Sequence, residues 1–376
     1  MEYGVFSSVY GNYKIEEAAE RIRRAGFRYV QFVPFFEGKF READEFSEED
    51  IAAIRSAYKS NGLTVVGIAG GHGFVHPEKS RRERALRNAK RWIELAPELG
   101  APLVVTEVGS THPDHNWTDH PNNHTDETWE EVVNLYRDLA SHARQYGVTV
   151  GVEPHFAAVV NGGERLRRVL DEAAAENLKI VMDPANIITT QNAGSLEREL
   201  EDLFRLAGGD FVLAHAKDTR IVNGKSVFVP AGQGILPYRK YGALLRENGY
   251  ADPLILEYLE EGDVPDTLAW VKETGVPPYL LPVFRADARL YDALWAMQEI
   301  NHSKSGALEL KYRLLLSLVA DALQNHPAGS VACAKEAIEA GATREQVAEA
   351  MRVVYAAGGL PLLIENMDVY REVLLP

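Results

Sequence analysis

The chain contains almost no cysteine. Cys333 is the single thiol among 376 residues, so no disulfide can form within the chain. Disulfides belong to oxidising compartments, and a chain without them is typical of a reducing one. The segment Met1–Ser8 has no basic stretch and no long apolar run, unlike a signal peptide. No run approaches the ~20 apolar residues of a membrane helix. We therefore expect a cytoplasmic protein without a membrane partner.

Positive charge is also scarce. The chain has 40 Lys and Arg residues against 55 Asp and Glu residues, which gives a net charge of −15. Residues 281–376 contain 12 acidic and 9 basic residues, so most of the negative charge lies before them. Such a surface repels the phosphates of nucleic acids and of anionic membranes. This charge argues against a DNA-repair nuclease, which needs a basic groove, and we expect a small-molecule substrate.

Long hydrophobic runs are missing too, and short ones alternate with amphipathic stretches. Such alternation predicts β-α units with a parallel sheet, because parallel strands need a crossover helix between them. The runs are continuously apolar, as expected for strands covered on both faces. Eight units within residues 1–275 fit an α/β fold of the (β/α)8 barrel type, which typically has about 250 residues. An open doubly wound sheet is the alternative, but no Gly-rich loop follows the first run. The runs are Tyr3–Phe6, Tyr29–Val33, Thr64–Ile68, Leu103–Thr106, Thr149–Val152, Lys179–Met182, Phe211–Ala214 and Leu254–Leu256.

The pattern changes after residue 275. Three prolines fall within residues 276–284, which predicts a linker that is neither helix nor central strand. Residues 285–376 contain no strand-like run. They predict a smaller all-α domain with helices at 286–301, 307–325, 329–340, 343–357 and 366–374, and with a break at Gly358–Pro361.

Four consecutive strands of the predicted barrel end on residue types that bind metals. These residues are Glu153, Asp183, His215 and Glu257. The carboxyl ends of barrel strands converge on one face, so the four side chains can meet there. Each could instead be an ordinary polar residue that caps a strand, but four in succession favour a metal site. Three carboxylates and one imidazole make an oxygen-rich site, which suits Mn²⁺, Mg²⁺ or Co²⁺ better than a structural zinc.

The motifs around these residues resemble a known family. Val-Gly-Val-Glu-Pro-His (150–155), Met-Asp-Pro-Ala-Asn (182–186), Ala-His-Ala-Lys-Asp (214–218) and Leu-Glu-Tyr (256–258) are similar to the sugar isomerase/epimerase group of the xylose-isomerase-like superfamily. The resemblance covers residues 1–275. It implies one divalent ion bound by Glu153, Asp183, His215 and Glu257. Mn²⁺ is the ion expected first, with Mg²⁺ or Co²⁺ as alternatives. The resemblance also implies that Glu153 and Glu257 act as proton acceptor and donor while the metal stabilises an enediolate.

Other residues are candidates for substrate contacts. Asn186 stands where the epimerase branch usually has a histidine, and Arg220 resembles the substrate-binding arginine of the family. His72 and Glu107 lie at the same predicted barrel mouth, and His155 follows Glu153 closely. We expect Lys217-Asp218 to support the site through an ion pair. A histidine-rich loop is interpreted as a lid with Trp117, and a second metal site there is the alternative; its histidines are His112, His115, His120 and His124.

Residues 285–376 are similar to the carboxymuconolactone decarboxylase/AhpD-like helical family. The resemblance lies in the segment 308–323 and in the Ala-Gly-Ala-Thr turn at 340–343. Redox-active members carry a glutamate, two cysteines and a histidine, at the positions of Leu314, His326, Gly329 and Cys333 here. None matches, and a lone thiol cannot form an intramolecular disulfide. The resemblance implies a homo-oligomer. Apolar faces that exceed what a small domain can bury alone support such self-association; they include Leu314, Leu315, Leu318 and Val319.

Three functions remain open at this point. The first is a metal-dependent isomerase or epimerase of a keto-sugar or related polyol. The second is a lyase on the same barrel, such as a dehydratase of an inosose or of 3-dehydroshikimate, since both reactions begin with removal of a proton alpha to a carbonyl. The third is a non-catalytic sugar-binding protein, which the intact ligand set disfavours. The sequence leaves the substrate, its phosphorylation and the native metal undetermined.

Overall fold

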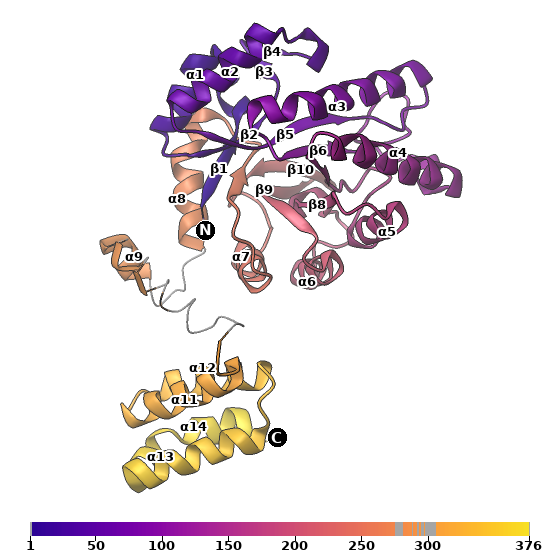
Figure 1. Ribbon diagram of the computed structural model, residues 1–376. Helices are drawn as coiled ribbons and strands as arrows, with labels where there is room; N and C mark the ends of the chain where they lie inside the picture. Colours follow the sequence, from indigo (N-terminus) through magenta and orange to yellow (C-terminus); the bar gives the residue numbers. More distant parts are fainter. Residues whose placement is uncertain are drawn as a thin grey trace. The chain divides into compact units, whose positions relative to one another are not determined.

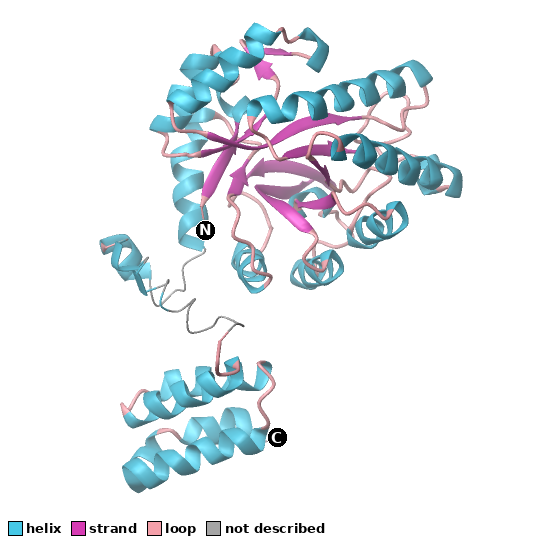
Figure 2. Cartoon of the chain, viewed as in Figure 1, coloured by secondary structure: helices cyan, strands magenta, loops and turns pink. Residues whose placement is uncertain are grey.

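The computed structural model describes residues 2–274, 281–287, 289–291, 293–294, 297 and 306–375. The chain divides into two compact units, residues 1–277 and 278–376. The first, the barrel unit, contains strands surrounded by helices, and the described residues of the second, the helical unit, form helices and loops (Figures 1 and 2). The predicted combination of an α/β barrel with an all-α region is therefore confirmed.

Eight parallel strands close into a barrel in the first unit. Neighbouring strands pair in the order β1-β2-β5-β6-β7-β8-β9-β11, and β11 pairs again with β1, so the sheet has no open edge among these strands. This closure excludes the open doubly wound sheet. The strands are β1 (Tyr3–Phe6), β2 (Tyr29–Phe32), β5 (Thr64–His72), β6 (Leu103–Glu107), β7 (Thr149–Val152), β8 (Leu178–Met182), β9 (Phe211–Val222) and β11 (Leu254–Leu256).

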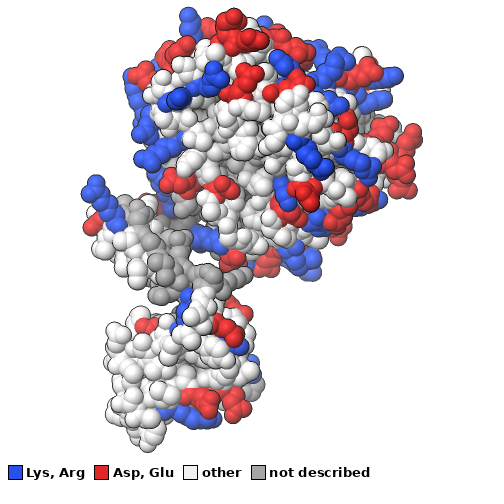
Figure 3. All heavy atoms as spheres, in the orientation of Figure 1, with Lys and Arg blue, Asp and Glu red and all other residues white. Residues whose placement is uncertain are grey.

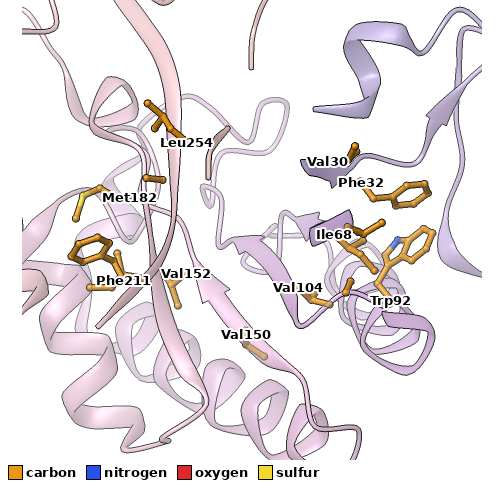
Figure 4. Packing of buried hydrophobic residues seen from close by; sticks show 14 of the residues in the cluster. Val30, Phe32, Ile68, Trp92, Val104, Val150, Val152, Met182, Phe211 and Leu254 are labelled. Carbon is orange, nitrogen blue, oxygen red and sulfur yellow. The ribbon is translucent and has the colours of Figure 1, made fainter. Parts of the chain in front are cut away.

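Eight helices pack around the barrel because each presents one apolar face to it. Side chains from both layers bury each other, as Phe32, Ile68 and Trp92 do in Figure 4. A smaller cluster, which includes Leu103, Val181 and Ile255, fills part of the barrel interior. The helices are α1 (Ile15–Arg24), α2 (Glu48–Ser60), α3 (Lys79–Leu99), α4 (Asp126–Arg144), α5 (Gly163–Ala173), α6 (Leu196–Ala207), α7 (Tyr238–Glu247) and α8 (Val264–Thr274).

Strand β9 is much longer than the sequence pattern predicts. It continues past Ala214 to Val222 and pairs in antiparallel fashion with β10 (Lys225–Pro230). The connection is Asn223-Gly224, with φ angles of 50° and 73°, as in the tight turns that suit β-hairpins. His215 therefore lies within a strand instead of at its end. A second short hairpin, β3 (Phe35–Phe36) with β4 (Lys39–Phe40), was also not predicted.

The helical unit has a core of its own. Leu318, Ala334, Val347 and Met351 are among the side chains fully buried in it. Much of the face of this unit in Figure 3 carries neither acidic nor basic side chains, whereas both kinds are mixed over the barrel unit. The elements are α9 (Leu281–Ala286), α11 (Leu310–Leu323), α12 (Pro327–Glu339), α13 (Arg344–Glu365), α14 (Met367–Val369) and a π-helical turn (Tyr370–Leu374).

The predicted linker and first helix are only partly described. Residues 275–280, and half of the predicted helix 286–301, lie outside the described residues. The prediction that 276–284 contains no helix is wrong for 281–284, which belong to α9. Pro282 falls in the first turn of that helix, where a proline is tolerated because its missing N–H would have no intrahelical partner.

Helix α13 is long and apolar enough to cross a membrane by length and composition, with 22% of its most apolar window buried. The helical backbone of α13 is interrupted at Gly359, which has φ 77° and ψ −176°, and Pro361 follows two residues later. This is the break expected at Gly358–Pro361. The apolar segment is therefore two shorter helices, each below the ~20 residues that span a bilayer.

Candidate metal centre

Four buried side chains meet at the carboxyl ends of four barrel strands. Glu153, Asp183 and Glu257 directly follow β7, β8 and β11, and His215 lies in β9 in register with Ile255. Each offers one ligand atom, and these four atoms all lie within 4.8 Å of one another. The quartet, as we name these four residues, is formed because a closed parallel barrel brings its strand ends to one mouth.

One atom of the quartet, the buried His215 Nδ1, has no hydrogen-bond partner. The buried Asp183 Oδ2 and Glu257 Oε1 are contacted by the ammonium of Lys217. His215 Nδ1 lies 3.4 Å from Glu153 Oε1, 3.8 Å from Asp183 Oδ2 and 3.5 Å from Glu257 Oε1. A buried polar atom without a partner is costly, and a cation between the four side chains would satisfy His215 Nδ1 and be balanced by the three carboxylates. The residues present therefore fit a divalent metal ion.

Gln31 orients the imidazole of His215. Gln31 Oε1 lies 2.8 Å from His215 Nε2, and both side chains are at most 1% exposed. Because the amide oxygen accepts, Nε2 carries the proton and Nδ1 presents its lone pair to the quartet. The edge of Phe6 also packs on the ring, with centroids 5.3 Å apart. Sequence reasoning missed Gln31, although a glutamine within the apolar run Tyr-Val-Gln-Phe was a signal.

Asn186 is tied to the quartet. Its Nδ2 donates to Glu153 Oε1 at 2.8 Å, while its Oδ1 has no partner. The backbone of the same turn is held by Asp183, whose Oδ1 accepts from the N–H groups of Ala185 (3.0 Å) and Asn186 (3.4 Å). Asp183 thus caps the 3₁₀ turn Pro184–Ile187 with Oδ1, which leaves Oδ2 for the ion pair with Lys217.

Lys217 supplies positive charge inside the mouth. Its Nζ lies 2.7 Å from Asp183 Oδ2 and 2.7 Å from Glu257 Oε1, and 4.5 Å from the ring centroid of Phe228. Burial opposes its charge, but the carboxylates of Asp183 and Glu257 raise the pKa of Lys217 above its ordinary value. The expected supporting ion pair thus exists, with partners in the quartet. Asp218 instead accepts backbone N–H groups, from Thr219 at 2.8 Å and from Leu236 at 2.9 Å.

The carboxyl groups of the mouth have different proton affinities. Burial raises the pKa of Glu257 to about 7, although Lys217 acts in the opposite direction. Burial, together with the charge of Glu153, also raises the pKa of Glu107 well above its ordinary value. Burial would raise the pKa of Asp183 as well, but Lys217 and His215 hold it well below its usual range. Carboxyl groups with such unequal pKa values are the usual basis of acid–base pairs.

The other candidates divide into two groups. His72 is the last residue of β5 and pairs in register with Glu107, because β5 extends beyond the predicted run. The ring of Trp117 lies 5.4 Å from His72 and 4.7 Å from His155, so the loop after β6 meets both. Burial lowers the pKa of His72 and lowers that of His155 to about 3. Arg220 is exposed instead, and its guanidinium donates to the carbonyl of Gln233 at 2.6 and 3.0 Å. The structure does not bring Arg220 to the quartet.

The histidine-rich loop is held together by hydrogen bonds. Asn123 is fully buried and bonds Ser110 and the carbonyl of Ala157, which anchors the loop to the segment after β7. His124 pairs with Asp119 at 3.0 Å. His112 and His120 form hydrogen bonds within the loop, and the ring of His115 lies 6.0 Å from that of His112. Among the residues that the structure describes, the quartet is the only group of metal-binding side chains close enough to share an ion. The alternative of a second metal in this loop gains no support.

The comparisons with known proteins agree with this geometry. The family model of the xylose isomerase-like TIM barrel matches residues 19–274, so the chain belongs to that family. The model of the carboxymuconolactone decarboxylase family matches residues 288–371. Both resemblances seen in the sequence are thereby confirmed. No curated protein matches the chain significantly by sequence.

Solved structures resemble the barrel unit. One is a xylose isomerase-like TIM barrel protein from Mycobacterium smegmatis in complex with magnesium (16% identity, TM-score 0.56, 73% of this chain and 98% of that chain covered). Another is a D-psicose 3-epimerase in the presence of D-fructose (16%, 0.55, 73% and 99%). A third is the IOLI protein with a bound zinc atom (16%, 0.57, 73% and 98%). At these identities the likeness concerns the fold.

Proposed function

We propose that the chain is a divalent-metal-dependent isomerase or epimerase that acts on a keto-sugar or related polyol through an enediolate. The observation that carries this proposal is the buried quartet, whose ligand atoms lie within 4.8 Å of one another and in which His215 Nδ1 has no hydrogen-bond partner. The D-psicose 3-epimerase of the same fold supports the choice of substrate. In this proposal the barrel (1–275) carries the chemistry, and the lone cysteine favours a cytoplasmic location.

The proposed ligands are Glu153, Asp183, His215 and Glu257, with Mn²⁺ as the expected ion and Mg²⁺ or Co²⁺ as substitutes. Oxygen-rich donor sets favour these metals. When bound, the ion would act as a Lewis acid that polarises the carbonyl group and lowers the cost of negative charge on its oxygen. Lys217 would remain as a second positive charge beside Asp183 and Glu257.

Glu153 and Glu257 are the proposed proton-transfer pair. Their Oε1 atoms lie 3.4 and 3.5 Å from the same atom, His215 Nδ1. They have different neighbours, since Asn186 donates to Glu153 and Lys217 contacts Glu257. One glutamate removes the proton alpha to the carbonyl and the other returns a proton. His72, Glu107, His155 and Asn186 are the proposed substrate contacts. Arg220 would contact the substrate only if its guanidinium broke its hydrogen bonds to the carbonyl of Gln233.

Proton exchange into candidate substrates tests the proposal. The Mn²⁺-loaded protein is incubated in D₂O with ketoses, inososes and 3-dehydroshikimate and followed by NMR. We expect deuterium at the carbon next to the carbonyl, and loss of this exchange when a chelator removes the metal. The product then separates an epimerase, which returns the proton, from a lyase, which releases water. Absence of exchange with every compound in the metal-loaded protein would overturn the proposal.

For residues 285–376 we propose self-association without redox chemistry. The Cys333 thiol lies 3.6 Å from Asp321 Oδ2, and burial raises its pKa to about 12, which keeps it from forming a reactive thiolate. A Cβ atom at Gly329 would come within 2.5 Å of Asp321 and His326, so a cysteine does not fit there without rearrangement.

The apolar faces named from the sequence need a correction. Leu314 and Leu318 are buried within the helical unit at 4% and 0% exposure, and Leu315 and Val319 pack partly against the same core. These side chains are therefore used inside the unit. The exposed apolar side chains are others, such as Leu316, Val353, Leu360 and Ile364, which are each more than half exposed. They are the surface that we propose for contact with a second copy.

A further inference from the structure

Aromatic rings form a continuous series at the mouth of the barrel. Ring centroids lie 5.4 Å apart for His72 and Trp117, 4.7 Å for Trp117 and His155, 5.7 Å for His155 and Phe228, and 5.4 Å for Phe228 and Tyr258. We name these five residues the aromatic wall. They come from β5, β10 and the segments after β6, β7 and β11, so distant parts of the sequence converge to build it.

The aromatic wall adjoins the quartet. His155 and Tyr258 stand two residues and one residue after the ligands Glu153 and Glu257. Phe228 lies 4.5 Å from Lys217 Nζ, which in turn lies 2.7 Å from two quartet oxygens. Trp117 is 39% exposed and Tyr258 is 56% exposed, so both keep free surface. Exposed aromatic faces beside a few converging polar groups are typical of a binding site for a small molecule.

The formal charges of the quartet and Lys217 would cancel when a divalent metal is bound, and Glu107 adds a further acidic group to the mouth. The quartet contributes three carboxylates, which a divalent ion and the ammonium of Lys217 balance. In the described part of the chain, Lys217 is the one basic side chain found in contact with the quartet, and it already bridges two carboxylates. The guanidinium of Arg220 is bonded to Gln233. A phosphate or carboxylate on the substrate would thus enter without a counter-charge, which is costly in a buried site.

We infer that the substrate is an uncharged polyhydroxylated compound, with a C–H face against the aromatic wall and its hydroxyl groups toward the quartet. This inference rests on the proposed function and narrows it. It sets aside phosphorylated sugars, and it sets aside 3-dehydroshikimate, which carries a carboxylate. Among the compounds considered from the sequence, free ketoses and inososes remain.

Matched pairs of compounds test the charge requirement. D-Fructose is compared with D-fructose 6-phosphate, and an inosose with 3-dehydroshikimate, on the Mn²⁺-loaded full-length protein. Deuterium exchange by NMR gives reactivity, and calorimetric titration gives affinity without turnover. We expect the neutral member of each pair to bind at least about tenfold more tightly. Equal or tighter binding of the charged member would overturn the inference. Deuterium exchange with charged compounds only would overturn the inference of an uncharged substrate but would still agree with the proposed isomerase. Binding of neutral compounds without any exchange would contradict the proposed isomerase but not the preference for uncharged compounds.

Substitution of a wall residue tests the stacking. Trp117→Ala should weaken binding of the neutral compound about tenfold at unchanged metal content, because the compound loses its contact with the ring face; tenfold corresponds to about 1.4 kcal/mol. Trp117→Phe should keep most of the affinity. Tyr146→Ala is a matched control, because Tyr146 is also 39% exposed but lies after α4 against His142, and it should change nothing. Equal affinity of the Trp117→Ala and Tyr146→Ala variants would contradict a role for the aromatic wall.

Discussion

At the scale of single residues, the four candidate ligands could be predicted because each directly follows, or interrupts, an apolar run. The residues that orient them could not, since hydrogen bonds such as Gln31 to His215 and Asn186 to Glu153 join side chains 184 and 33 positions apart. Spacing along the chain carries no information on such contacts. The same limit applies to Arg220, whose motif position suggests the substrate while its guanidinium bonds Gln233.

Removal of the amide of Gln31 should weaken metal binding. Gln31→Leu leaves His215 Nε2 without an acceptor, so the imidazole loses the restraint that directs Nδ1 to the metal. Partners of this kind typically contribute about 10–100-fold in metal affinity. Calorimetric titration of Mn²⁺ measures the change, and Gln31→Glu, which keeps an acceptor, should restore most of it. An unchanged affinity in a folded Gln31→Leu protein would show that Gln31 does not orient His215.

Neutral replacements of the two glutamates should abolish most turnover. Glu153→Gln and Glu257→Gln remove the groups proposed to transfer protons, a loss of about 10²–10⁴-fold. Asn186→Ala should retain a measurable fraction, because Asn186 positions Glu153 and transfers no proton. Metal content must be measured in each variant, since both glutamates are also proposed ligands. Full activity in either metal-loaded glutamine variant would refute the assignment.

At the scale of elements, the barrel strands could be predicted because burial on both faces makes them continuously apolar. The β9–β10 hairpin escaped the pattern, since its residues alternate and several are exposed. A local signal was present in Asn223-Gly224, whose positive φ angles fit a tight hairpin turn. The hairpin matters for the site because it carries Phe228 of the aromatic wall.

A side chain at the hairpin turn should destabilise it. Gly224 has φ 73°, a conformation that costs a β-branched residue roughly 1–2 kcal/mol. Gly224→Val should therefore lower the Tm and, by displacing Phe228, weaken substrate binding. Gly194→Ala is the control, since Gly194 has no positive φ and no atom within 4 Å of an added Cβ. A Gly224→Val protein with unaltered Tm and affinity would argue against a fixed hairpin.

An ion-pair cluster between β8 and α5 should make stability depend on pH. Arg167 and Lys179 lie 2.8 and 2.7 Å from Asp210 and hold its pKa below the ordinary value. A carboxylate whose pKa is lower in the folded than in the unfolded state stabilises the fold at pH values above its unfolded-state pKa. This contribution is lost as the pH falls through the folded-state pKa. Asp210→Asn should thus lower the Tm near pH 7 but not near pH 2. A constant Tm difference across this range would exclude the effect.

At the scale of the whole molecule, the sequence predicted two units because the β-α alternation stops near residue 275. It could not identify which apolar side chains remain on the surface of the helical unit, because helical spacing does not distinguish a core face from an interface. Leu318 is fully buried, for example, and Leu316, two positions earlier, is 61% exposed.

Negative charge on the exposed apolar surface of the helical unit should prevent the proposed association of two copies of the chain. The double variant Leu316→Glu, Val353→Glu places carboxylates where two proposed partners would meet, so light scattering should report a smaller particle than for the unmodified chain. Tyr146→Glu, on the barrel unit, is the control and should leave the mass unchanged. The proposed self-association through residues 285–376 is wrong if the unmodified chain is already monomeric, or if the double variant forms the same oligomer as the unmodified chain.

The extended strand β9 has a consequence for how this protein could diversify. Its first half holds His215 inside the closed barrel, and its second half leaves the barrel to pair with β10. The proposed metal ligand His215 and the proposed substrate contact Phe228 thereby lie on consecutive segments of the chain, one inside the barrel and one in the hairpin. If the proposed function holds, exchange of residues 219–230 should change substrate preference and leave the proposed metal ligands in place. The β9–β10 hairpin is therefore the segment in which substitutions aimed at a new substrate specificity should be made first.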